Sequence, residues 1–209
     1  MRRIYTQQWG DSDGYDVLVM WGNDIKPGED RFQAVTRKYQ ALQRIFLSGP
    51  WSSLLCVEQD MLLPPDALQR LAQLVADGAD IAYSLYVWRY QDLHWWSAHP
   101  RITVDDAGVP WFYSMTHLPE QARARWGEPI IVDGLGLGCT LISRQTLVRL
   151  PFRQSNAEHC CDTALALDAK AEGLIQICDT GAVCGHRLDA TRVIWPDPTT
   201  PTLYRIEEE

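Results

Sequence analysis

The sequence predicts an α/β protein whose central sheet is mostly parallel. Three observations favour this class: apolar runs of strand length alternate with helical patterns over the first ninety residues, a second strand–helix succession follows residue 138, and 46% of the 209 residues are hydrophobic. Parallel neighbours need a long connection, usually a helix, so the alternation is typical of the class. The length and apolar content suit one domain with a complete core.

Hydrophobic periodicity predicts the elements of the first half. Residues 15–20, 54–57 and 81–88 are apolar runs of strand length. Residues 66–77 form a helical pattern after a pair of prolines. An earlier helix shows its apolar face in Phe32, Val35, Tyr39, Leu42 and Ile45. Residues 89–137 are rich in aromatic and turn residues, and we expect an elaborated loop region there.

The second half repeats the alternation. Residues 138–143 and 174–178 are strand candidates, and residues 144–150 and 161–171 have helical patterns. The Pro/Thr-rich tail with an acidic end, residues 196–209, is expected to lie on the surface.

The charge balance restricts the partners. A formal net charge of -8 disfavours an extended nucleic-acid footprint, because affinity for phosphate backbones comes largely from Lys and Arg. Arginines predominate among the 19 basic residues, so a local groove for phosphate stays open. No run of 18 apolar residues occurs, and the N-terminus lacks the apolar core of a signal peptide, so we expect no membrane association and a cytoplasmic protein.

The six cysteines occur without a CxxC pair and are expected to be reduced thiols, several of them buried. A zinc site would have to draw on this set: His159, Cys160, Cys161, Cys178, Cys184 and His186. Adjacent cysteines rarely bind one ion and these spacings match no common structural site, so the pattern disfavours zinc.

An acidic turn follows the predicted strand at residues 54–57. The strand ends abruptly in Glu58-Gln59-Asp60, and a helical pattern begins soon after. Ligands of open α/β sheets bind at the carboxyl ends of strands, so two carboxylates here predict a site for a metal-bound diphosphate. The alternative is an acidic cap for the following helix, which the triplet alone does not exclude.

Three blocks, in this order, resemble nucleotide-sugar glycosyltransferases with the GT-A fold, of the family-2-like type. The first block is LLCVEQDMLLPPDALQRL, which is similar to the family's strand ending in an acid-x-acid motif. The second is GLGLGCTLISRQTLVRLPF, which resembles the Gly-rich strand and helix that border the acceptor side. The third is CDTALALDAKAEGLIQICDTGAVCGH, which resembles the acidic helix, the next strand and a closing histidine.

The resemblance implies a GT-A (Rossmann-like) three-layer sandwich with a mostly parallel central sheet. Residues 1–209 would form one glycosyltransferase domain, with the donor half at 15–100, the acceptor half at 101–195 and a tail at 196–209. The sequence departs from the family in two motif positions. Glu58 stands where Asp is commoner, and Cys161 precedes Asp162 where Glu is usual.

The resemblance also implies a divalent metal, Mn²⁺ or Mg²⁺, and a general base. Asp60 would bind the metal directly, Glu58 would act through the ribose, water or the outer shell of the metal, and His186 would be the third protein contact. Asp162 would take the proton of the attacking hydroxyl if the reaction inverts the anomeric configuration. The alternatives are a hydrogen-bonded loop histidine at 186 and a helix-terminal carboxylate at 162.

The remaining site residues would hold the two substrates. The polar turn with Trp21 and Asn23 is expected at the nucleotide, and Arg187 and Arg192 are expected to close over the diphosphate as a mobile lid. Aromatic faces stack on sugars or bases, and one or two of the tryptophans are expected to face the acceptor while the rest are buried. The acceptor set is Trp88, Trp95, Trp96, Trp111 and Gly136.

The sequence therefore predicts a metal-dependent glycosyltransferase that uses a nucleotide-diphosphate sugar, by resemblance a UDP-sugar. The acceptor is the hydroxyl of a glycan or small molecule, or a hydroxymethylated base of DNA as in phage-type DNA modification. Two alternatives remain: a nucleotidyltransferase on a similar fold, and a non-catalytic module that binds a nucleotide or sugar. The particular sugar, the stereochemistry and the oligomeric state stay open.

Overall fold

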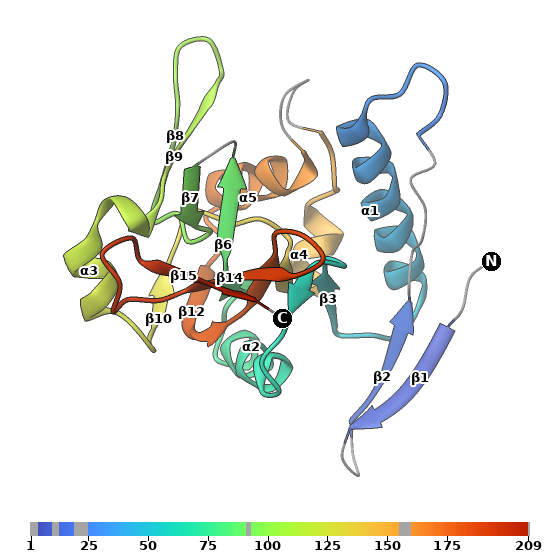
Figure 1. The fold of residues 1–209 in the computed structure, drawn as a ribbon. Coiled ribbons are helices and arrows are strands. Elements are labelled where there is room, and N and C mark those ends of the chain that lie inside the picture. The colour runs from blue at the N-terminus through green and yellow to red at the C-terminus, as the bar shows by residue number, and fades with distance from the viewer. Residues whose placement is uncertain (1–3, 10–12, 19–24, 91–92, 155–159, 209) are drawn as a thin grey trace.

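The computed structural model describes residues 4–9, 13–18, 25–90, 93–154 and 160–208 (Figure 1). A five-stranded sheet forms its centre. In spatial order its strands are β10 (Pro129–Ile131), β12 (Gln176–Val183), β5 (Ile81–Leu85), β11 (Cys139–Ser143) and β3 (Ser53–Val57).

The predicted fold class, a GT-A three-layer sandwich with a mostly parallel central sheet, is wrong. Of the four pairings in this sheet, β12–β5 is parallel and the other three are antiparallel. Antiparallel pairs also form every other sheet among the described strands. An apolar run shows that a strand is buried, but it does not show in which direction the strand crosses the sheet.

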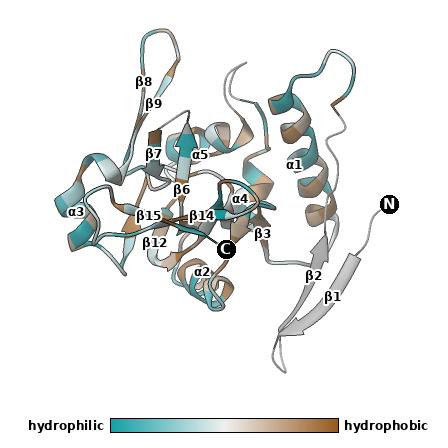
Figure 2. Ribbon diagram, in the orientation of Figure 1, coloured by the Kyte–Doolittle hydropathy of each residue, from teal (hydrophilic) through white to brown (hydrophobic). Residues whose placement is uncertain are grey.

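Helices lie on both faces of the central sheet. Along β5, Ile81, Tyr83 and Leu85 belong to one core, and Ala82 belongs to the other. The first core also takes residues from four helices: α1 (Arg31–Ser48), α3 (Pro119–Ala124), α4 (Arg144–Arg149) and α5 (Cys161–Ala171). The second core packs against α2 (Ala67–Ala76). Both α1 and α2 carry hydrophobic and hydrophilic stretches in Figure 2, as expected for helices with one buried side.

Both ends of α1 are satisfied by side chains. At its start, Asp30 and Gln33 form a reciprocal capping box. Near its end, the Arg144 guanidinium donates to the carbonyls of Leu47 and Gly49 at 2.8 and 2.9 Å. The helix end is therefore tied to the strand–helix junction before α4. None of the described helices is both long and apolar enough to span a bilayer.

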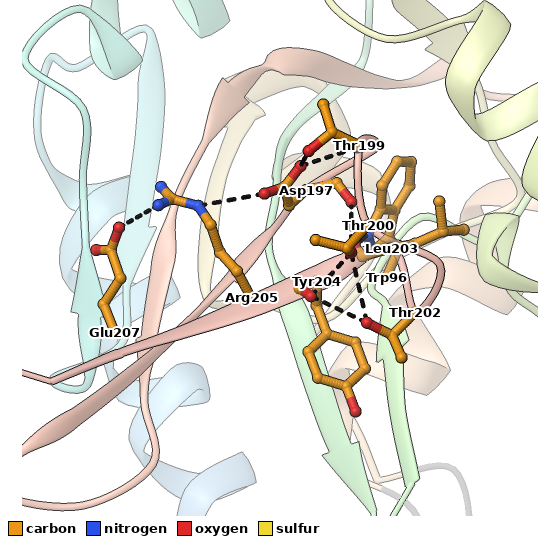
Figure 3. Close-up of polar contacts among 9 residues, drawn as sticks. All are labelled: Trp96, Asp197, Thr199, Thr200, Thr202, Leu203, Tyr204, Arg205 and Glu207. Carbon is orange, nitrogen blue, oxygen red and sulfur yellow. Dashed lines mark hydrogen bonds and ion pairs between the residues drawn. The ribbon is translucent and has the colours of Figure 1, made fainter.

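A second, four-stranded sheet contains the C-terminal segment. Its order is β15 (Tyr204–Glu208), β14 (Arg192–Pro196), β13 (Gly185–Arg187) and β4 (Met61–Leu62). The residues of β15 are mostly exposed, so this strand lies on the surface, but the tail does more than cover it, because β15 pairs with β14. The turn before β15 enters the core: the indole N–H of Trp96 donates to the Leu203 carbonyl at 2.5 Å (Figure 3).

Two other predicted segments form β-hairpins in the structure. The first predicted strand pairs with an earlier one in a separate two-stranded sheet, β1 (Ile4–Trp9) with β2 (Asp13–Leu18), outside the central sheet. The expected loop region also contains two hairpins, and β8–β9 projects from the body in Figure 1. Their strands are β6 (Val87–Tyr90), β7 (Leu93–Trp96), β8 (Arg101–Val104) and β9 (Pro110–Tyr113). A 3-10 turn (Met115–His117) and α3 (Pro119–Ala124) follow.

Candidate functional site

Strand pairing brings Asp60 and His186 together, although 126 residues separate them. Asp60 directly precedes β4, and His186 on β13 pairs with Met61 of β4. The amide of Arg187 also donates to the Asp60 carbonyl at 2.8 Å. As a result, His186 Nε2 lies 3.3 Å from Asp60 Oδ2.

The surroundings of His186 determine which ring nitrogen carries hydrogen. Nδ1 lies 2.8 Å from the Val87 carbonyl oxygen, which can only accept, so Nδ1 carries the hydrogen. In a neutral ring Nε2 then presents its lone pair to the Asp60 carboxylate. This arrangement is favourable when Nε2 is protonated or when a cation lies between the two groups.

Electrostatics at this pair favour the charged forms. Burial lowers the pKa of His186, but the hydrogen bonds to Asp60 and to the Val87 carbonyl outweigh it, so the pKa lies above its ordinary value. The hydrogen bond from His186 lowers the pKa of Asp60 in turn. The Asp60 side chain is 43% exposed, so solvent weakens the pair.

Two more carboxylates belong to the same group. The pKa of Glu58 is raised to about 7, first by desolvation among protein atoms and then by the charges of Asp162 and Asp60. Glu58 nevertheless keeps exposed surface, so solvent reaches a carboxylate that protein atoms surround. Asp162 lies in the first turn of α5, where Thr163 donates its backbone N–H to Asp162 Oδ1 at 2.6 Å. We call Glu58, Asp60, Asp162 and His186 the acidic corner.

Glycines allow the groups at the corner to approach closely. A Cβ at Gly136 would lie 2.3 Å from the Tyr86 hydroxyl and 3.4 Å from Asp162 Oδ2. A Cβ at Gly138 would lie 2.9 Å from the Tyr86 ring, and the Gly138 carbonyl accepts from the Glu58 amide. Any larger residue at Gly136 would displace Tyr86 or Asp162, so this glycine, predicted on the acceptor side, lies beside the corner.

Two tyrosines at the corner were not predicted as site residues from the sequence. The edge of the Tyr86 ring meets His186 at a centroid distance of 5.8 Å and an interplanar angle of 88°. Burial and the charges of nearby groups, Glu58 and Asp162 among them, raise the pKa of Tyr86 and of Tyr39 well above the ordinary value. Both residues lie in apolar patterns, so the sequence indicates core positions for them and carries no separate signal for the site.

The predicted acceptor tryptophans do not form one group. Trp96 is 1% exposed and donates its indole N–H to a backbone carbonyl, so it is one of the tryptophans of the set that are buried. Trp88 is 38% exposed and packs against Trp95, with ring centroids 5.7 Å apart. Trp111 is 59% exposed on the β8–β9 hairpin.

The residues predicted to contact the nucleotide are only partly described by the structure. Trp21 and Asn23 lie outside the described residues. Arg187 and Arg192 belong to the paired strands β13 and β14, so the expected lid is a hairpin. The Arg192 guanidinium is paired with Asp189 at 2.6 Å, which holds it at the turn of that hairpin.

Among the described residues, no group of three or more His, Cys, Asp and Glu side chains is arranged to hold a metal ion. Asp60 and His186 supply two donors. All six cysteines are free thiols and five are buried. Of the six His and Cys residues considered for a zinc site, His159 lies outside the described residues.

Comparisons with known proteins show the fold alone. No family model matches the chain, and no curated protein matches it. Among solved structures, the crystal structure of A197 from STIV, a viral protein, matches with a TM-score of 0.58. The match covers 84% of this chain and 76% of that chain, at 14% sequence identity.

Proposed function

We propose that this protein is a metal-dependent glycosyltransferase that moves a sugar from a nucleotide-diphosphate sugar to an acceptor hydroxyl. The observation that carries the proposal is the acidic corner: Asp60 contacts His186, and Asp162 and Asp60 raise the pKa of Glu58. Clusters of titratable groups with mutually shifted pKa values are typical of catalytic sites. The UDP-sugar as donor rests on the resemblance of the three sequence blocks.

The donor atoms at the corner fit a divalent cation. A carboxylate oxygen and an imidazole nitrogen with its lone pair suit Mn²⁺, and the oxygen also suits Mg²⁺. Asp60 and His186 would hold the ion, and the diphosphate of the donor would supply further oxygens, which a site with two protein donors requires. When bound, the ion would neutralise the charge that develops on the leaving diphosphate.

The residues of the chain have separate tasks in this proposal. In an inverting transfer, Asp162 accepts the proton of the acceptor hydroxyl, whose oxygen bonds to the anomeric carbon as the bond from that carbon to the diphosphate breaks. Gly136 lets the Tyr86 hydroxyl approach the backbone beside Asp162 Oδ2. Val87 holds the His186 ring through its carbonyl, so Nε2 stays directed at Asp60. A retaining transfer would need no base at Asp162.

The acceptor is proposed to be a glycan or small-molecule hydroxyl, or a hydroxymethylated DNA base. The net charge of -8 favours the first, because an acidic protein gains little from a phosphate backbone. We propose a cytoplasmic location, since six free thiols are typical of a reducing compartment.

The decisive experiment is a panel of UDP-, GDP- and ADP-sugars with and without Mn²⁺. Thermal shift measures binding, and release of the nucleoside diphosphate measures turnover. We expect one sugar nucleotide to give both signals only with the metal. Asp60→Ala and His186→Ala should remove the thermal shift and greatly reduce turnover. Asp66→Ala, which removes an exposed carboxylate six residues away, is the matched control and should keep both signals.

Other outcomes would favour the alternatives. Pyrophosphate released from a nucleoside triphosphate would indicate a nucleotidyltransferase. A metal-dependent thermal shift without turnover of any sugar nucleotide would indicate a binding module. Shifts that Asp60→Ala leaves unchanged would contradict the proposed site.

A further inference from the structure

The β8–β9 hairpin has two chemically different faces. Arg101 pairs with Tyr113 and Thr103 pairs with Trp111. Directly opposed residues and residues two apart share a face of a β-ribbon, so these four side chains lie together. Ile102 lies on the other face.

The inner face fastens the hairpin to the body of the protein. Ile102 is buried, its amide donates to Asp133 Oδ2 at 2.8 Å, and its carbonyl accepts from Lys170 Nζ at 2.7 Å. The Phe112 ring packs against His99 with centroids 5.2 Å apart. Because Lys170 belongs to α5, the base of the hairpin is tied to a core helix.

The outer face is aromatic and exposed. Trp111 is 59% and Tyr113 is 49% exposed. Residues two apart in a strand are about 7 Å apart, so the two rings are neighbouring platforms. The Arg101 guanidinium lies 5.7 Å from the centroid of the Tyr113 ring.

The Trp111 indole is oriented before any ligand arrives. Its N–H donates to Asp105 Oδ2 at 3.2 Å. The other carboxylate oxygen of Asp105 accepts the amides of Ala107 and Val109 at 3.0 and 2.8 Å, which fixes that carboxylate in the turn. An exposed ring held in this way loses little conformational entropy on binding.

We propose that the outer face of the β8–β9 hairpin binds a neutral carbohydrate chain. Trp111 and Tyr113 stack on the apolar C–H faces of consecutive sugar rings, and Arg101 and Asp105 exchange hydrogen bonds with the hydroxyls at the ring edges. Polar groups beside an apolar surface fix the orientation of a ligand and give the site specificity. Binding here needs no nucleotide donor, so it is tested apart from the transfer reaction.

Charge distinguishes the carbohydrate from other ligands of aromatic platforms. The turn of the hairpin carries Asp105 and Asp106, and the net charge of the chain is -8. Single-stranded nucleic acid and anionic membranes bind through Lys and Arg, and acidic side chains beside the platform repel both. A neutral chain of sugars meets no such repulsion, and carboxylates are good acceptors for its hydroxyls.

The test is affinity gel electrophoresis of the full chain in gels that contain one soluble neutral polysaccharide each, namely hydroxyethyl cellulose, laminarin, mannan, xylan or dextran. We expect at least one to retard the protein. Trp111→Ala and Tyr113→Ala should each weaken the apparent affinity roughly tenfold, as expected for loss of one stacked ring. Trp111→Phe keeps a ring but loses the bond to Asp105, so it should weaken binding less than Trp111→Ala.

Three controls make the result decisive. Ile131→Ala removes a 77% exposed apolar side chain from β10 and should leave retardation unchanged. Asp60→Ala should also leave it unchanged, which separates this site from the proposed transfer reaction. Thermal melting should show that the hairpin variants fold like the parent, because both rings are exposed.

The opposite results would overturn the proposal. These are retardation by none of the neutral polysaccharides, or retardation that Trp111→Ala and Tyr113→Ala leave unchanged. Binding confined to heparin, to oligo(dT) or to phosphatidylglycerol vesicles would likewise show that the platform serves a polyanion or a membrane instead.

Discussion

The surroundings of Trp96 and the acidic corner differ in how their polar groups are satisfied. Trp96 is 1% exposed, its indole N–H donates to Leu203, and its backbone amide donates to the Thr116 hydroxyl at 2.7 Å. At the corner, three carboxylates and one imidazole crowd together, and the pKa of Glu58 rises to about 7. The first region is stabilised by its contacts, whereas the second keeps unfavourable electrostatics that a bound cation would relieve.

The C-terminal turn that contacts Trp96 has its own polar groups satisfied by hydrogen bonds. The Thr200 hydroxyl, with one hydrogen to donate, lies within hydrogen-bond distance of two carbonyl oxygens, 3.2 Å from that of Asp197 and 3.0 Å from that of Tyr204 (Figure 3). Leu203 is buried and has a φ of 63°, a left-handed conformation that costs about 1–2 kcal/mol in a residue with a side chain. The burial of Leu203 and its bond to Trp96 offset this cost.

The largest expected effect on stability is that of Trp96→Ala. Loss of a large buried ring leaves a cavity and an unpaired Leu203 carbonyl, so the free energy of unfolding should fall by about 4 kcal/mol. Urea unfolding of the parent and the variant measures this loss of free energy. Arg205→Ala, which breaks exposed ion pairs with Asp197 and Glu207 in the same segment, should cost less than about 1 kcal/mol. Equal losses would contradict the contrast between the core turn and its surface.

Asp60→Ala should have the largest effect on function. We expect turnover of the sugar nucleotide to fall roughly a hundredfold, which corresponds to about 2.7 kcal/mol of transition-state stabilisation. The free energy of unfolding should change by less than about 0.5 kcal/mol, because solvent weakens the ion pair between His186 and the half-exposed Asp60 carboxylate. Steady-state kinetics and urea unfolding of one preparation check both. A large loss of stability would show that the corner is structural.

His99 should make the protein less stable in acid. Burial, and to a smaller extent His117, lower its pKa to about 4, and its Nδ1 has no hydrogen-bond partner among the described residues. Between pH 6.5 and 4 the unfolded chain binds a proton that the native chain does not, so stability falls as the pH falls. The loss at pH 5 is about 2 kcal/mol. Urea unfolding at pH 5 and pH 8 should show a smaller difference for His99→Phe, and parallel pH profiles would refute this.

Glu58→Gln should give the smallest effect, with the opposite sign. The raised pKa of Glu58 means that the native chain binds the extra proton between pH 4.5 and 7, so its contribution to stability falls as the pH rises through that window. Because Glu58 keeps exposed surface, we expect the Glu58→Gln variant to gain only about 1 kcal/mol at pH 8. Urea unfolding at pH 8 and pH 4 measures the gain, which should vanish at pH 4. Destabilisation at pH 8 would show that the corner is not electrostatically strained.

By itself, the sequence determined the elements with clear periodicity. The helical patterns at 66–77 and 161–171 became α2 and α5, and the apolar runs at 54–57 and 138–143 became β3 and β11. Local spacing of apolar residues decides which side of a helix or strand is buried, so these elements need no tertiary information. The same spacing marked Asp60 as a residue just after a strand.

Tertiary structure alone decided strand direction, the neighbours of each strand and the partners of the site. Whether β11 runs with or against β5 depends on how distant segments pack, and an apolar run is the same in both cases. Likewise, Trp96 is a core residue because distant segments, among them Trp126 and the C-terminal turn, pack against it, whereas Trp111 is exposed on the β8–β9 hairpin. Asp60 meets His186 because β4 pairs with β13, a long-range pairing that no local pattern encodes.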